Sequence, residues 1–396
     1  MISEKKAYFL VFILLFFSGN PLAFFLFGKY STLVGLLLSI LNIKPNFNID
    51  KYFSNKLNSF LFIILIIVLL QYLTLTSLSS LAFVNLVLKI LMGGLILNYL
   101  KESFAYIFFR VISTLSLFSL IGFIFINQFG FNLPFIIVSQ SYKSYFLYGS
   151  LSGEAFFRNC GMFWEPGAFS GILTLCLALN IKFLNYYWVN YKLQLISIFL
   201  ALLTTQSTTG YIVGFFIFLF NLINHKNIFR TLILFFTFLF ISFYIYNKTN
   251  FLKTKLDNQF FRASNQSVGD FSNSRFGSII FDWHYILKHP FSGNGFNFKT
   301  RYADHQFLFR GATDNLDVIG SGNGFSNFLA SMGILFISLY FFLLWNTSKF
   351  LGNKFAFFIC LIVFLNLQGE QFFNYPLYLS LPFIIFEKTN SDLILH

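Results

Sequence analysis

The feature that most constrains this chain is the recurrence of long apolar runs from one end to the other. Only 10% of its 396 residues are charged and 57% are hydrophobic, including 63 Phe. Ordinary soluble domains carry roughly 25% charged residues, which they need to cover their surface. We therefore expect lipid, rather than water, to surround most of the chain.

The apolar runs predict an all-α integral membrane protein with about twelve transmembrane helices, of which the second and eleventh are short. Backbone groups in lipid must be hydrogen-bonded within the protein, and continuous rather than alternating apolar runs favour helices over a barrel. The predicted spans cover residues 8–27, 31–43, 57–75, 81–99, 103–126, 166–184, 188–205, 210–223, 229–246, 324–345, 355–367 and 372–386.

These spans leave two long connecting segments and divide the chain into five parts. The parts are the N-terminal transmembrane helices (1–126), a first external loop (127–165), the central transmembrane helices (166–246), a large external loop (247–323) and the C-terminal transmembrane helices (324–396). Lys5 and Lys6 precede the first run as in a signal peptide, but the run is too long and lacks a small-residue cleavage site. We expect it to be a retained helix.

Positive charge predicts that both termini are cytoplasmic and both long loops external. With the N-terminus inside, most Lys and Arg of the short connections fall on the cytoplasmic side, and only Lys29 falls outside. The large loop itself carries nine Lys or Arg and six Asp. This basic excess favours an anionic partner near the membrane, such as lipid phosphate. No DNA-binding motif is present, so no nucleic-acid partner is expected.

The three cysteines predict neither a disulfide framework nor a metal centre. Cys176 and Cys360 lie in predicted spans, Cys160 is external and unpaired, and no CxxC or HExxH pattern occurs. We therefore expect no metal cofactor.

A first candidate site lies at the end of the first external loop. Arg158 precedes Glu165, and Glu165 is followed by Pro166, which suits the first turn of a helix. The helix dipole would stabilise the carboxylate, and arginine is the natural bidentate ligand of a phosphate. A plain capping role for Glu165 is the alternative.

The large loop holds a predicted helix over residues 274–290. Its apolar residues share one face, which predicts a helix lying in the outer membrane interface and ended by Pro290: Ile279, Ile280, Trp283, Ile286 and Leu287. Such a helix would serve as an anchor without a catalytic role.

The most polar stretch of the chain follows, over residues 299–317. It places Asp304, His305 and Arg310 together and leads through a glycine-rich segment into the next span. A histidine in a solvated loop is more often a bystander than a base, but this loop is predicted to stay near the membrane.

Three charges lie at membrane depth in the predicted topology: Lys89, Arg110 and, near the outer end of the last hairpin, Glu370. Such charges are costly and mark functional candidates. For Lys89 the alternative is a partner across the bundle. The sequence assigns no role to Lys89 or Arg110.

An ordered set of short motifs resembles the bacterial O-antigen or capsule polymerase family and, more loosely, the O-antigen ligases. The set comprises Arg158-x-x-Gly161-x-Phe163-x-Glu165-Pro166-Gly167, Ser207-Thr-Thr-Gly210, Ser274-Arg275, His289-Pro290-x-x-Gly293-x-Gly295 and Gly322-Asn323-Gly324-Phe325 through Leu329 to Gly333. Ligases typically carry a histidine where this chain has Gly322, so the resemblance favours a polymerase.

The resemblance implies a metal-independent glycosyltransferase in the bacterial inner membrane. It would join undecaprenyl-diphosphate-linked oligosaccharide repeat units at the outer face, in contact with membrane lipid and with a chain-length regulator protein as a partner. Glu165, or Asp304 with His305, would be the general base, and Arg158, Arg275 and Arg310 would hold the diphosphate. His289 and Asn323 would also bind substrate.

Three alternatives remain open at this stage. They are an O-antigen ligase, a flippase for lipid-linked oligosaccharide and a non-catalytic assembly partner. A transporter usually shows repeated halves, and this chain shows no internal repeat.

Overall fold

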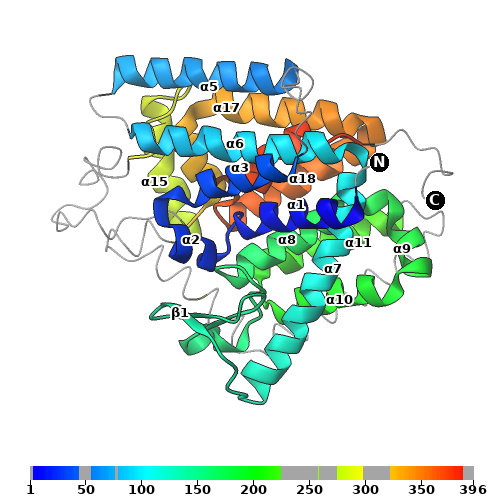
Figure 1. The fold of residues 1–396 in the computed structure, drawn as a ribbon. Coiled ribbons are helices and arrows are strands. Elements are labelled where there is room, and N and C mark those ends of the chain that lie inside the picture. The colour runs from blue at the N-terminus through cyan, green and yellow to red at the C-terminus, as the bar shows by residue number, and fades with distance from the viewer. Residues whose placement is uncertain are drawn as a thin grey trace.

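The computed structural model describes residues 3–43, 55–75, 79–223, 257, 274–297 and 322–386, and it is predominantly helical. Figure 1 shows long helices running side by side in one bundle, with α15 crossing their direction at one end. The segment 127–165, which holds a small sheet, lies toward that same end.

The described residues of the N-terminal third contain six α-helices, because long apolar runs dominate this part of the chain. Their bounds are α1 (Glu4–Phe16), α2 (Pro21–Phe27), α3 (Ser31–Asn42), α5 (Asn55–Thr74), α6 (Ser80–Leu100) and α7 (Phe104–Gly122). The predicted first span is broken between α1 and α2. Gly19 has φ +111°, and the Asn20 side chain caps Leu22 N at 2.8 Å ahead of Pro21. A capping residue followed by proline starts a new helix whatever the surrounding hydropathy.

The first long segment is not helical throughout. After a π-helical turn (Phe123–Gln128), three short antiparallel strands follow in the order β1 (Ile136–Ser139), β2 (Tyr142–Ser144) and β3 (Gly149–Leu151). Tyr142 is buried in this sheet and stacks on Trp164 at 5.8 Å between ring centroids. The stacking fixes the chain just before Glu165.

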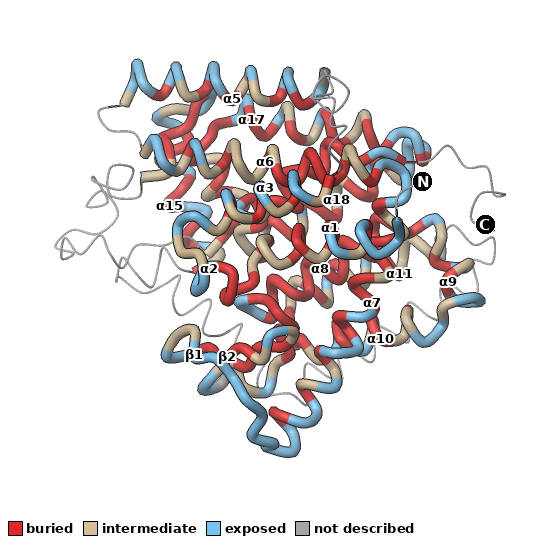
Figure 2. The backbone as a smooth tube through the Cα atoms, in the orientation of Figure 1, coloured by how far each residue is buried: buried red, intermediate tan, exposed pale blue. Residues whose placement is uncertain are grey.

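Helix α8 (Pro166–Leu179) is the centre of the bundle, since every one of its 14 residues is buried. It packs against α7, α11 and α18. Figure 2 shows α8 in the middle of the bundle, among other helices. The following helices are α9 (Leu184–Asn190), α10 (Lys192–Thr204) and α11 (Thr208–Ile223). Helix α5, in contrast, lies at the edge and exposes much of its apolar surface.

The predicted helix in the large loop is confirmed as α15 (Arg275–Lys288). Four of the five residues predicted to share an apolar face are exposed, and Ile286 is buried. The opposite side packs on α17 (Gly324–Ser348), where Ser326 donates a 2.7 Å hydrogen bond to the fully buried Asp282. A buried carboxylate bonded in this way holds α15 to the bundle.

Helix α17 is interrupted at Gly333, which has φ 74° and ψ 176°, a conformation that only glycine adopts without strain. The turn after α15 (His289–Gly295) fills the interruption. Ile334 N donates to Pro290 O, and Asn294 N and Gly295 N donate to Ala330 O and Ser331 O. These bonds replace helical hydrogen bonds that the break removes, as an apolar environment requires.

Gln71 of α5 also hydrogen-bonds to the main chain at this break. Its fully buried amide donates to Ser292 O and to Ser331 O. The motif His289-Pro290-x-x-Gly293-x-Gly295 therefore has a structural explanation, because a Cβ on Gly293 would collide with the backbone of Ser331.

The C-terminal part consists of α18 (Asn353–Gly369) and the short α19 (Pro376–Ser380). The predicted span 372–386 is not one helix. Pro376 is the first residue of α19, and Pro382 is the second residue of a 3₁₀ turn (Leu381–Phe383); proline donates no backbone hydrogen bond, so it interrupts a continuous helix.

The prediction of about twelve spans is not supported. Four helical stretches of the described residues are long and apolar enough to cross a membrane: Pro21–Asn42, Lys56–Thr74, Ser80–Gln128 and Gly324–Leu351. A fifth results if Pro166–Leu179 and Ile181–Asn190, bent by 64°, form one span. The predicted span 229–246 lies outside the described residues. The apolar helices still indicate a membrane protein.

Candidate functional site

A cavity of about 640 Å³ lies where the two predicted external segments meet the helices. It brings together three charged side chains, Glu165, Arg275 and Glu370. Its polar and aromatic lining comes from Asn20, Trp164, Gln371, Asn374 and Tyr375. Carboxylates, a guanidinium, amides and aromatic rings in one cavity suit the binding of a polar molecule.

Glu165 presents its carboxylate to this cavity. It stands in extended conformation (φ −141°, ψ 152°) directly before Pro166, and its side chain makes no capping hydrogen bond to α8. Within the described part of the chain its carboxylate makes no hydrogen bond or ion pair, and the residue is exposed; its main-chain carbonyl accepts from Phe169 N at 3.1 Å. Glu165 therefore holds the N-cap position without serving as a cap, so its carboxylate is available for chemistry.

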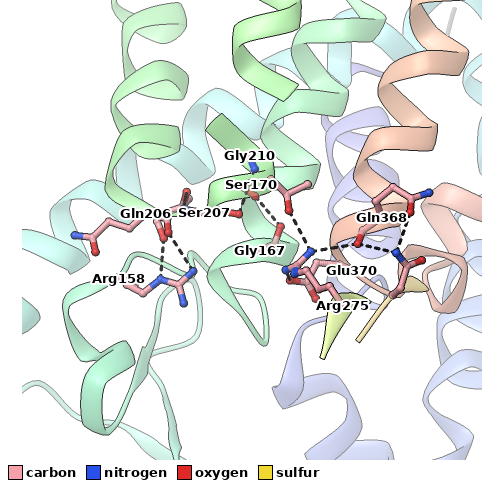
Figure 3. A network of polar contacts seen from close by, with 12 residues as sticks. Arg158, Gly167, Ser170, Gln206, Ser207, Gly210, Arg275, Gln368 and Glu370 are labelled. Atoms are coloured by element: carbon pink, nitrogen blue, oxygen red, sulfur yellow. Dashed lines mark hydrogen bonds and ion pairs between the residues drawn. The ribbon is translucent and has the colours of Figure 1, made fainter. Parts of the chain in front are cut away.

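Arg275 is placed by the start of α15, where Ser274 accepts a hydrogen bond from Gly277 N at 2.9 Å. Its guanidinium pairs with Glu370 at 3.6 Å and donates to Thr209 Oγ1 and Gln368 O (Figure 3). The side chains of Arg275 and Glu370 are 28% and 21% exposed, so the pair is half-buried and still open to the cavity.

The glycine of the Glu-Pro-Gly motif is explained by Glu370. A Cβ on Gly167 would collide with Glu370 Oε1, so the first turn of α8 must lack a side chain at this point. Gly167 and Glu370 are consequently packed tightly together, and Glu370 lines the cavity.

Arg158 lies on the other side of the α8 N-terminus and does not line the cavity. Its Nε and Nη2 donate to the carbonyls of Thr205 and Gln206 at 3.2 and 3.3 Å. Burial lowers the pKa of Arg158, and the charges of Glu370 and Glu165 oppose that shift. The guanidinium holds a turn in which Gln206 adopts a positive φ of 49°.

The remaining predicted site residues are distributed differently. Asn323 caps α17 by accepting from Ser326 N and donates to Gln368 Oε1, next to the cavity. His289 ends α15, and its carbonyl accepts from Gly293 N. Asp304, His305 and Arg310 lie outside the described residues.

Sequence reasoning missed two contributors and only partly identified a third. Glu370 was expected to be a functional charge but was not placed in the site, because its partner Arg275 is remote in sequence. Asn20 reaches the cavity through the unpredicted break before α2, and its buried Nδ2 has no hydrogen-bond partner in the described part of the chain. Tyr375 follows the polar stretch that ends α18, and that stretch was the available signal.

Among the described residues no three His, Cys, Asp or Glu side chains gather closely enough to hold a metal ion. Comparison with protein-family models, with curated proteins and with solved structures finds no match to this chain.

Proposed function

We propose that this protein is a membrane glycosyltransferase that joins polyprenyl-diphosphate-linked oligosaccharide units into a surface polysaccharide, as the polymerase resemblance implies. The observation that carries the proposal is the cavity in which Glu165, Arg275 and Glu370 lie together at the ends of the helices. A glycosyl transfer of this kind needs a base for the acceptor hydroxyl and positive charge for the leaving diphosphate.

Glu165 is the proposed general base. Its carboxylate is exposed to the cavity and makes no hydrogen bond to the helix behind it. In the transfer, the acceptor oxygen forms a bond to the anomeric carbon of the donor sugar, and the bond from that carbon to the diphosphate oxygen breaks. The proton of the acceptor hydroxyl passes to Glu165, and the electron pair of the broken bond leaves with the diphosphate.

Arg275 is the proposed diphosphate ligand among the described residues. Guanidinium groups bind phosphate in bidentate fashion, and Glu370 keeps the side chain oriented at the cavity wall. The N-termini of α15 and α17 also reach this cavity through Arg275 and Gly322 and add partial positive charge. We assign Arg158 instead to the turn at Gln206, which it holds through two carbonyls.

The polar lining suits a carbohydrate. Asn20, Gln371 and Asn374 offer amide groups, and Trp164 and Tyr375 offer aromatic rings. Phe24 lines the same cavity and is 64% exposed, which gives the cavity an apolar margin for the prenyl chain. The proposed site is at the outer face of the bacterial inner membrane, with cytoplasmic termini, and a chain-length regulator protein is the proposed partner.

The class of reaction is tested by deleting the gene and examining surface glycan and lipid extracts. A polymerase deletion leaves single repeat units and no ladder of longer chains. Long polymer retained on the carrier with a bare lipid core would identify a ligase and contradict the proposal. Repeat units trapped on the cytoplasmic side would identify a flippase, which would also contradict it.

A further inference from the structure

Arg110 is a charged residue within the long apolar stretch Ser80–Gln128, and the described part of the chain gives it no ion pair. Its guanidinium lies over the Tyr191 ring at 5.1 Å from the centroid. The Tyr106 and Tyr191 hydroxyls are 3.2 Å apart, and the Tyr8 hydroxyl lies against the guanidinium while bonded to Glu4. In the described part of the chain the guanidinium thus contacts aromatic rings and neutral hydroxyls, and the Glu4 carboxylate bonds to Tyr8 and forms no ion pair with Arg110.

Tyrosines and basic residues around Arg110 mark the level of a membrane interface. The Nζ of Lys192 lies 5.2 Å from the centroid of the Trp188 ring, and the rings of Tyr186 and Tyr191 are in contact. Aromatic rings concentrate where the headgroups meet the hydrocarbon. With both termini inside, as the charge pattern predicts, this interface belongs to the cytoplasmic leaflet, away from the proposed catalytic cavity.

An apolar groove of about 380 Å³ begins at the same place and runs between α1 and α7. Tyr8 belongs to both the groove and the cluster around Arg110, and Val111 lines the groove directly after Arg110. From there the groove continues past Phe12 and Leu115 to Phe118. Residues 111 to 118 of a helix span roughly 10 Å, so the groove follows the direction of a lipid chain.

We propose that this groove binds one anionic phospholipid of the cytoplasmic leaflet. The lipid phosphate contacts the Arg110 guanidinium and the hydroxyls of Tyr8, Tyr106 and Tyr191, and one acyl chain lies between α1 and α7. Charge complementarity identifies the occupant. A guanidinium that has no ion pair in the described part of the chain, and that adjoins an apolar groove, fits a molecule with an anion at one end and a hydrocarbon chain beyond it. A free phosphate would leave the groove unfilled.

Native mass spectrometry of the full chain in a neutral detergent tests the proposal, with phosphatidylglycerol titrated against phosphatidylcholine. The wild-type protein should retain one phosphatidylglycerol at saturation and no equivalent phosphatidylcholine. Arg110→Gln should weaken phosphatidylglycerol binding by about tenfold, as expected for the loss of a charge-assisted hydrogen bond. Lys192→Gln removes an exposed cation at the same level and should leave binding unchanged.

A second variant tests the groove while keeping the charge. Thr114 is exposed and lines the groove, so Thr114→Trp should fill it and reduce phosphatidylglycerol retention at an unchanged melting temperature. Equal loss of binding in Arg110→Gln and Lys192→Gln would show non-specific attraction and overturn the proposal. So would full retention in Thr114→Trp, or displacement of the lipid by inorganic phosphate alone.

Discussion

Arg158 and Arg275 flank the N-terminus of α8, yet their surroundings differ in kind. Arg158 belongs to a closed side, where its guanidinium donates to two backbone carbonyls and the neighbouring Cys160 is fully buried. Arg275 belongs to an open side, where it pairs with Glu370 in the wall of the cavity that also holds Glu165. The two sides differ in what holds each guanidinium: main-chain carbonyls enclose that of Arg158, whereas a carboxylate holds that of Arg275 in a cavity wall.

The largest effect should come from the open side, at Glu165. Glu165→Gln keeps the shape of the side chain but cannot accept the acceptor proton, so polymer formation should fall by about 10²–10⁴-fold. The loss of polymer formation is measured from the ladder of chain lengths in a deletion strain that carries the variant gene. Glu102→Gln, an exposed carboxylate outside the cavity, is the matched control. Normal ladders in Glu165→Gln at equal protein level would remove Glu165 from the mechanism.

Replacing each arginine by lysine should have different effects: mainly a loss of activity at Arg275 and mainly a loss of stability at Arg158. Arg275→Lys keeps the charge but loses the fork, and we expect about tenfold or greater loss of polymerisation. The melting temperature should fall less than in Arg158→Lys, because Gln368 O also accepts a hydrogen bond from Asn323 Nδ2 at 3.4 Å. Arg158→Lys leaves a carbonyl without its donor and should lower stability by about 1–3 kcal/mol.

Thermal unfolding of the purified variants, together with gel analysis at matched protein level, makes this distinction. The opposite outcome, in which Arg158→Lys is stable and inactive, would return the phosphate role to Arg158. The contrast between the two sides would then be wrong.

A smaller effect should follow from crowding the Glu370 carboxylate. Gly167→Ala places a methyl group where Glu370 Oε1 now lies, so Glu370 must move away from Arg275 and activity should fall severalfold. The shorter side chain of Glu370→Asp makes room, and the double variant should recover part of the loss. Loss in both single variants without any recovery in the double variant would indicate that the two positions act independently.

The smallest effect is a difference in thiol reactivity between the two sides. Burial raises the pKa of the Cys160 thiol to about 12, so at neutral pH the thiol is protonated and unreactive. Asn374→Cys places a thiol at an exposed position of the cavity. A water-soluble maleimide should label Asn374→Cys within minutes and leave Cys160 unlabelled until the protein is denatured. Rapid labelling of Cys160 in the folded protein would show that the closed side opens.

The sequence predicted the uninterrupted helices well and the broken ones poorly. The predicted spans 57–75 and 81–99 match α5 and α6 to within about two residues, because nothing in them interrupts the helix. The run 8–27 is equally apolar but breaks at Gly19 and Asn20. Average hydropathy is insensitive to a helix cap and to a glycine in the left-handed region. It therefore did not predict the break between α1 and α2.

The candidate site was predicted in its local parts and missed in its long-range ones. Glu165 and Arg275 each stand in a short motif next to a helix start, which sequence spacing can reveal. Their meeting with Glu370, Asn20 and Tyr375 depends on the packing of helices that are remote in sequence. The contacts of Arg158 with main-chain carbonyls leave no signature in residue types. Asp304, His305 and Arg310 stay predictions.

The turn that fills the break in α17 has a consequence for how this protein can diversify. Asn294 and Gly295 are bonded to Ala330 and Ser331, and α17 begins at Gly324, so the chain between them leaves and rejoins the same rigid support. The hydrogen bonds that seat the turn in α17 all lie within described residues, so a change of sequence between residues 298 and 321 removes none of these side chains or main-chain partners.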